Sequence, residues 1–263
     1  TSLYVYNRNM KNLSTDDRYL QFGSGPVIVL LHGLFGALSN FEKVIEYFQQ
    51  DYTVLFPQLP LYTSPLLNST VSGMVDFVNV IIEEKQFSNL HLVGNSLGGH
   101  IGLVYALKNM DKVASITLTG SSGLFENSLG DGYPNKENYD YIRKKTEYTF
   151  YDPTVASKEL VDEIFNTVND RAKAIRVIAL AKSALRHNLR KELNKIDIPA
   201  NIIWGGNDNI TPLFVGEEFQ KLIPNAKLSV IDKCGHAAMM EHPERFNALL
   251  DQFLTDLNVK NLG

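Results

Sequence analysis

The sequence predicts an α/β fold in which a mostly parallel sheet carries helices on both faces. Apolar, β-branched runs such as 27–31 show no alternation with polar residues, as expected of strands buried on both faces. These runs alternate with segments of helical periodicity, which is typical of a parallel sheet. The length of 263 residues and the hydrophobic fraction of 44% suffice for one large core with an insertion.

The first part of the chain is expected to hold the centre of the sheet. Gly25-Pro26 and His32-Gly33 bound the strand at 27–31, and further apolar runs predict strands at 52–56, 90–93 and 113–119. Apolar residues at helical spacing predict helices at 41–48, 71–85 and 97–107. Such a sheet has its binding site beyond the carboxyl ends of the strands.

The character of the sequence changes at residue 121. Residues 121–140 are rich in Gly, Ser, Asn and Asp, and 141–193 has helical segments without a convincing strand. The alternation resumes with strands at 200–205 and 227–231 around a helix at 213–222, and Pro243 suits the start of a last helix to about 257. We therefore expect core at 1–120, an inserted helical lid at 121–193 and the remaining core at 194–263.

Composition favours a small-molecule substrate. The formal net charge of -4 disfavours nucleic acid or an anionic membrane as the main partner. The single cysteine, Cys234, excludes an intramolecular disulfide and is a poor start for a zinc site, so we expect no metal and no cofactor. No apolar run approaches the ~20 residues of a membrane span, and no signal peptide is recognisable. These features predict a soluble, cytoplasmic protein without a membrane span; they do not set its oligomeric state.

The pentapeptide Gly94-Asn95-Ser96-Leu97-Gly98 lies between a predicted buried strand and a predicted helix. A G-x-S-x-G sequence in this context is a sharp turn that lifts the serine hydroxyl out of the sheet. The alternative for the motif alone is a tight loop without chemistry. We take Ser96 as the candidate nucleophile.

A serine nucleophile needs a base, and the base needs an orienting carboxylate. Asp208 follows the predicted strand 200–205, and His236 follows the next one, so all three residues fall at carboxyl ends of strands. His242 is an alternative base, but its place before Pro243 favours a packing role. Two alternative carboxylates are less suited, because Asp232 is very close to His236 in the chain and Asp197 precedes its strand.

Four motifs in this order resemble the α/β-hydrolase family: 32–36, 94–98, 205–212, and Gly235-His236 with 241–243. The resemblance extends from about residue 20 to the end and implies the α/β-hydrolase fold. It also implies a catalytic triad of Ser96, Asp208 and His236. The backbone N–H groups of Leu34 and Leu97 would form the oxyanion hole. His32 would pack beneath the oxyanion loop, and Cys234 would be a small packing residue.

The expected reaction is hydrolysis of a small, largely apolar carboxylic ester through an acyl-enzyme. This hypothesis depends on the serine triad and on the apolar residues around it, such as Leu34 and Leu97. The residues expected to line the substrate pocket are Phe35, Asn95, Ala237 and Met240. Acyl transfer to an acceptor other than water would use the same triad. A non-catalytic ligand sensor is a further alternative, which an intact triad disfavours.

A narrower resemblance is to the meta-cleavage product hydrolases, which split a carbon–carbon bond. Asn95 beside the nucleophile, Tyr151-Asp152-Pro153 followed by 159–161, and Cys234-Gly235-His236 carry it. Those enzymes usually have a lid arginine where this chain has 163–165, and a tryptophan where it has Ala237. The cations that could replace that arginine are Arg171, Arg176 and Arg186. We therefore rank carbon–carbon hydrolysis second.

Overall fold

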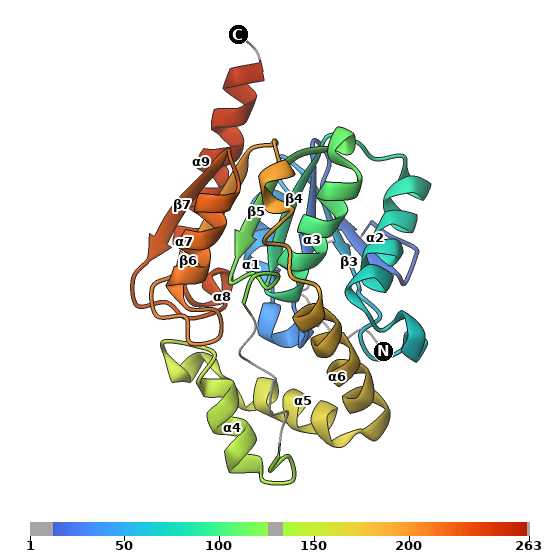
Figure 1. Ribbon diagram of the computed structural model, residues 1–263, viewed down its shortest axis with the longest axis vertical. Helices are drawn as coiled ribbons and strands as arrows, with labels where there is room; N and C mark the ends of the chain where they lie inside the picture. The colour runs from blue at the N-terminus through green and yellow to red at the C-terminus, as the bar shows by residue number, and fades with distance from the viewer. Residues whose placement is uncertain (1–12, 126–133, 262–263) are drawn as a thin grey trace.

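The computed structural model describes residues 13–125 and 134–261, and its centre is a seven-stranded sheet of order β1-β3-β2-β4-β5-β6-β7 (Figure 1). All neighbouring strands are parallel except β1 and β3, which are antiparallel. The strands are β1 (Tyr19–Phe22), β2 (Val27–Leu31), β3 (Thr53–Pro57), β4 (Leu90–Asn95), β5 (Val113–Thr119), β6 (Ala200–Gly205) and β7 (Ala226–Ile231).

Helices cover both faces of this sheet. The core helices are α1 (Glu42–Phe48), α2 (Val71–Lys85), α3 (Leu97–Lys108), α7 (Leu213–Leu222), α8 (Ala238–Glu241) and α9 (Pro243–Asn261). Successive side chains of β2 point to opposite faces. Ile28 and Leu30 pack with residues of α1 and α9, whereas Val29 and Leu31 pack with residues of α2 and α3. This double burial explains the continuous apolar run that predicted the strand.

Three further helices lie between β5 and β6 in sequence: α4 (Tyr139–Glu147), α5 (Lys158–Asn169) and α6 (Arg171–Arg186). They gather at one end of the sheet (Figure 1). Side-chain caps set their first turns, since Asn138, Ser157 and Asp170 each accept hydrogen bonds from backbone N–H groups at the start of a helix. Between 134 and 199 the structure has no strand.

The structure confirms the predicted fold and adds two elements that the pattern did not indicate. β1 is a four-residue edge strand with polar and apolar residues mixed, and it exists because it pairs with β3. α8 is a single turn that directly follows the loop of His236. Residues 126–133, within the predicted entry to the lid, lie outside the described residues. In the described parts, no helix combines the length and apolar character that crossing a bilayer requires.

Candidate active site

Ser96 occupies the sharp turn between β4 and α3. Its backbone has φ 55° and ψ -122°, a strained conformation for a residue with a side chain. The Ser96 N–H donates to the carbonyl of Thr119 at 3.1 Å, and the Ser96 carbonyl accepts from Gly99 N at 3.0 Å. Hydrogen bonds on both sides therefore hold the serine in this conformation at the carboxyl end of β4.

The glycines of the pentapeptide are required by close backbone contacts. A Cβ atom on Gly98 would collide with the carbonyl oxygen of Leu31 in β2, and one on Gly94 would lie 2.5 Å from Gly99 N. Strand and helix can approach this closely only where both positions lack a side chain. The spacing G-x-S-x-G thus follows from the geometry of the turn.

Asp208 and His236 form a buried pair. His236 Nδ1 lies 2.9 Å from Asp208 Oδ2, and their side chains are 7% and 0% exposed. Asp208 Oδ1 also accepts from the backbone N–H groups of Ile210 and Thr211 at 2.8 and 2.9 Å, and the Thr211 hydroxyl donates to Oδ2 at 2.9 Å. The carboxylate is therefore fixed by several donors and can orient the imidazole ring.

The end of β5 contacts both Ser96 and His236. Thr119 accepts from Ser96 N, and the next residue, Gly120, has φ +52° and packs against the ring of His236. A Cβ atom on Gly120 would lie 2.8 Å from His236 Nδ1. The structure thus gathers the three predicted triad residues at one edge of the sheet, although 140 residues separate the serine from the histidine.

The two predicted oxyanion-hole residues flank the candidate nucleophile. Leu97 is the first residue of α3, so its backbone N–H has no acceptor within the helix. Leu34 follows Gly33, on which a Cβ atom would lie only 3.2 Å from Ser96 Cβ. Both N–H groups thus belong to segments that border Ser96, and their role in binding an oxyanion stays a prediction.

His32 packs beneath the loop that leads to Leu34. Its Nδ1 lies 2.9 Å from Gly33 O, its Nε2 accepts from Leu59 N at 3.2 Å, and its ring stacks on Phe56. Burial lowers the pKa of His32 to about 4, so the ring is neutral at pH 7. These contacts agree with the structural role expected from the resemblance.

The alternative base and the two alternative carboxylates differ from His236 and Asp208 in their contacts or exposure. His242 Nε2 is 2.8 Å from the carbonyl oxygen of Lys233, and Asp197 and Asp232 are exposed. Cys234 is fully buried, and burial raises the pKa of its thiol, which suits packing rather than nucleophilic attack.

Two of the four expected pocket residues are fully enclosed in the structure. Asn95 and Ala237 are both 0% exposed, and their place in a substrate pocket stays a prediction. Asn95 Nδ2 donates to Thr119 O at 3.0 Å and to His236 O at 3.1 Å, and its Oδ1 accepts from Ser39 Oγ at 2.6 Å. Asn95 thus joins the nucleophile strand to the histidine loop. Phe35 packs against the helical unit, and Met240 is partly buried.

Glu241 is a supporting residue that sequence reasoning missed. Its Oε1 accepts from the N–H groups of Tyr151 and Asp152 at 2.8 and 3.0 Å, and its Oε2 accepts from Gly235 N at 2.5 Å. The carboxylate therefore ties the segment after α4 to the residue before His236. The sequence places Glu241 in the motif at 241–243, but its hydrogen-bond partners become visible only in the folded chain.

The helical unit presents an apolar cluster to the loop at 32–36. Phe35 packs in it with five buried side chains of α4, α5 and α6: Ile142, Val161, Ile164, Val168 and Val177. Ile164, only 2% exposed, belongs to 163–165, where the resemblance to the meta-cleavage product hydrolases would place a lid arginine.

The three candidate replacements for that arginine do not join the cluster. Arg176 uses its guanidinium on two backbone carbonyls, since Nε donates to Ser64 O at 2.7 Å and Nη1 donates to Ala172 O at 2.8 Å. Arg171 and Arg186 are exposed.

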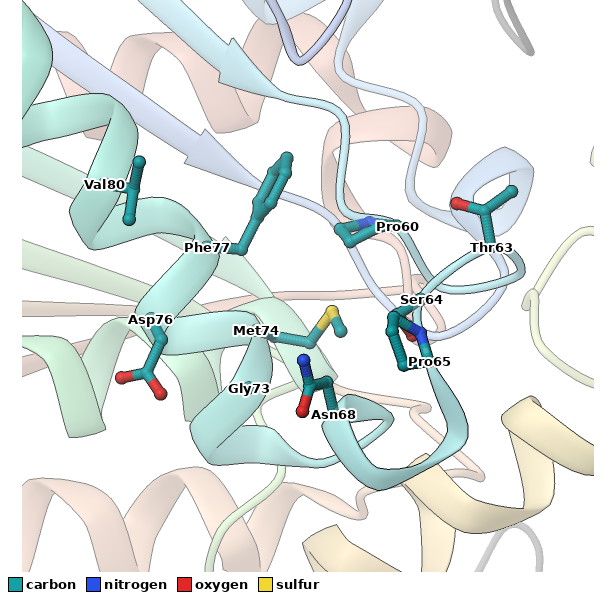
Figure 2. A pocket seen from close by; sticks show the side chains of 10 residues that line it. All are labelled: Pro60, Thr63, Ser64, Pro65, Asn68, Gly73, Met74, Asp76, Phe77 and Val80. Atoms are coloured by element: carbon teal, nitrogen blue, oxygen red, sulfur yellow. The ribbon is translucent and has the colours of Figure 1, made fainter.

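A surface hollow of about 500 Å³ lies between α2 and the loop that precedes it (Figure 2). Met74 and Phe77 of α2 project into it, opposite Pro60. None of the triad residues lines this hollow. It is therefore not part of the candidate active site.

Comparison with known proteins places the chain in a family. Residues 28–249 match the alpha/beta hydrolase family. A 2-hydroxy-6-oxononadienedioate/2-hydroxy-6-oxononatrienedioate hydrolase of Paraburkholderia phymatum is 29% identical, over 97% of this chain and 96% of its own length. A monoacylglycerol lipase of Bos taurus is 24% identical, over 90% of this chain and 77% of its own.

A solved structure gives the same result. An alpha/beta hydrolase enzyme from the metagenome of sediments from the lagoon of Mar Chica, Morocco, is 41% identical, with a TM-score of 0.77 over 94% of this chain and 100% of that one. The match with the family covers most of the sequence and includes all three triad positions. The chain therefore belongs to the alpha/beta hydrolase family and is a hydrolase.

Proposed function

We propose that this hydrolase cleaves small, uncharged carboxylic esters through an acyl-enzyme on Ser96. The observation that carries the proposal is the apolar cluster around Phe35, which includes Ile164, in the stretch where the resemblance to the meta-cleavage product hydrolases would place a lid arginine. The side chains of this cluster are at most 7% exposed and hold no cation, so a carboxylate brought against the helical unit here would lose its hydration without gaining an ion-pair partner. The monoacylglycerol lipase relative supports ester chemistry on this scaffold.

The mechanism follows from the Asp208–His236 pair. With the Nδ1 proton held toward Asp208 Oδ2, Nε2 accepts the Ser96 proton as Oγ attacks the ester carbonyl. The N–H groups of Leu34 and Leu97 stabilise the alkoxide that forms. His236 then gives the proton to the leaving alcohol. Water attacks the acyl-enzyme with His236 again as base, which releases the carboxylic acid and restores Ser96.

Carbon–carbon hydrolysis of a ring-fission product is the second candidate. The Paraburkholderia phymatum relative is named for such a reaction and matches nearly the whole chain, which supports this alternative. Its named substrates are dicarboxylates, and Arg171, Arg176 and Arg186 offer them no cation in the apolar cluster. Ester hydrolysis therefore ranks ahead of carbon–carbon hydrolysis. Acyl transfer to an alcohol would use the same acyl-enzyme, and we propose that residues 121–193 act as a lid in each case.

The test compares two substrate classes on the same protein. We expect serine-dependent turnover of p-nitrophenyl esters with short acyl chains, loss of this turnover in Ser96→Ala, and labelling of Ser96 by a fluorophosphonate. A ring-fission dienoate should bleach slowly or not at all. Rapid bleaching with little ester turnover would reverse the ranking. No labelling and no turnover of either class would reject a serine-dependent hydrolase.

A further inference from the structure

The outward face of α6 combines apolar side chains with cations. Ile175, Ile178 and Leu185 are 42%, 47% and 43% exposed. Arg171, Lys182 and Arg186 are exposed on the same helix. At 3.6 residues per turn, these six positions fall within a sector of about 100°. Branched apolar residues and cations thus share one exposed face, and that face contains no acidic residue.

The opposite face of α6 already holds the helix in place. Val177, Leu180 and Ala184 are buried in the core clusters. On the flank, Ser183 Oγ accepts from Val71 N at 3.0 Å, which fixes the loop before α2 against α6. That loop carries Leu67, which is 93% exposed. The outward residues of α6 are therefore not needed for the internal packing of this protein.

The charge of α6 differs from that of the whole chain. The helix has five Lys and Arg residues and no Asp or Glu, whereas the chain has a formal net charge of -4. Within residues 13–125 and 134–261, no ion pair involves Arg171, Lys182 or Arg186. The overall charge, which disfavours an anionic membrane as a partner, does not describe this surface.

We propose that the outward face of α6 docks on an anionic phospholipid surface. Ile175, Ile178 and Leu185 would enter the boundary of the acyl chains, while Arg and Lys stems of the same face let their charged ends reach lipid phosphates. A second copy of the chain fits less well, because a two-fold contact would place the same cations against each other.

The docking surface would bring the candidate active site to a lipid phase. α6 contributes Val177 to the apolar cluster that contains Phe35, next to the oxyanion loop. An apolar ester dissolved in a bilayer would then be presented to the helical unit that packs against Phe35. This inference rests on the proposed ester function for its biological use, but the binding itself is measurable without turnover.

The experiment measures co-sedimentation of the full chain with vesicles of phosphatidylcholine alone or mixed with phosphatidylglycerol. Replacing Arg171, Lys182 and Arg186 together by Gln should weaken binding to the anionic vesicles by about 100-fold, from three surface cations. Lys108, Lys144 and Lys227 are exposed cations on other elements. The matched control replaces these three lysines by Gln and should bind like the wild type. A third variant replaces Ile175, Ile178 and Leu185 by Ser and should also lose binding.

Each other outcome overturns the docking proposal. Wild-type protein that stays in solution with anionic vesicles, or equal losses in the two charge variants, would reject it. A dimer that only the Ser variant dissociates would assign the face to self-association. Retention on immobilised polyglutamate without vesicle binding would assign it to an acidic protein. Turnover of a soluble short-chain ester, measured in parallel, should be the same in all variants as in the wild type. A wild-type protein that binds the vesicles but turns over no ester would contradict the proposed function and leave the docking proposal standing.

Discussion

Glu241→Gln tests how the loop of His236 is held. The Glu241 carboxylate accepts three backbone N–H groups, from Tyr151, Asp152 and Gly235. A Gln side chain has nearly the same shape and can still accept the first two with its oxygen. Its amide nitrogen, however, would face the N–H of Gly235, so a charge-assisted hydrogen bond is replaced by two opposed donors.

The structure sets the size of the effect. A hydrogen bond to a charged acceptor contributes about 1.5 to 3 kcal/mol, and the partial exposure of Glu241 places this site in the lower part of that range. We expect a loss of about 2 kcal/mol in the free energy of unfolding, or about 5 °C in melting temperature. Because Gly235 precedes His236, kcat should fall by about 10-fold through misplacement of the imidazole.

The assay combines urea unfolding with ester kinetics on Glu241→Gln and on the control Glu244→Gln. Glu244 is exposed near the start of α9, so the control removes the same charge without changing the His236 loop. We expect wild-type stability and kcat in the control. Equal values for the two variants would refute the argument that this carboxylate positions the histidine.

Three further predictions concern the same site and its surroundings. Thr211→Val removes the hydroxyl that donates to the triad carboxylate and should lower kcat by about 10-fold with little change in KM; an unchanged kcat would contradict this role. Asn95→Leu breaks the links to β5 and the histidine loop and should cost about 3 kcal/mol in stability, measured by urea unfolding. Burial lowers the pKa of His32 and of His91 to about 4, and that of His100 to about 3. Because the unfolded chain binds these protons at pH values where the native state excludes them, stability should fall from pH 7 to about pH 5, by about 2 kcal/mol for each histidine. A melting temperature that stays constant over this range would contradict it, and His91→Gln should reduce the slope.

Much of the candidate site could be read from the sequence because it lies in short motifs with fixed local geometry. The turn at Ser96 needs glycines at 94 and 98, since strand and helix collide otherwise. Asp208 and His236 each follow a buried strand, and parallel strands end at the same edge of the sheet. Glu241 could not be assigned in this way, because its three donors come from segments that meet only in the folded chain.

The sequence by itself determined the fold class, the order of most strands and helices along the chain, and the three candidate catalytic residues. These follow from hydrophobic periodicity and from backbone constraints that act over a few residues. Only the tertiary structure decided that the Asn95 side chain is enclosed and links β5 to the histidine loop, and that Ile164 joins an apolar cluster with Phe35. Such contacts join segments that are far apart in the chain, so no local pattern encodes them.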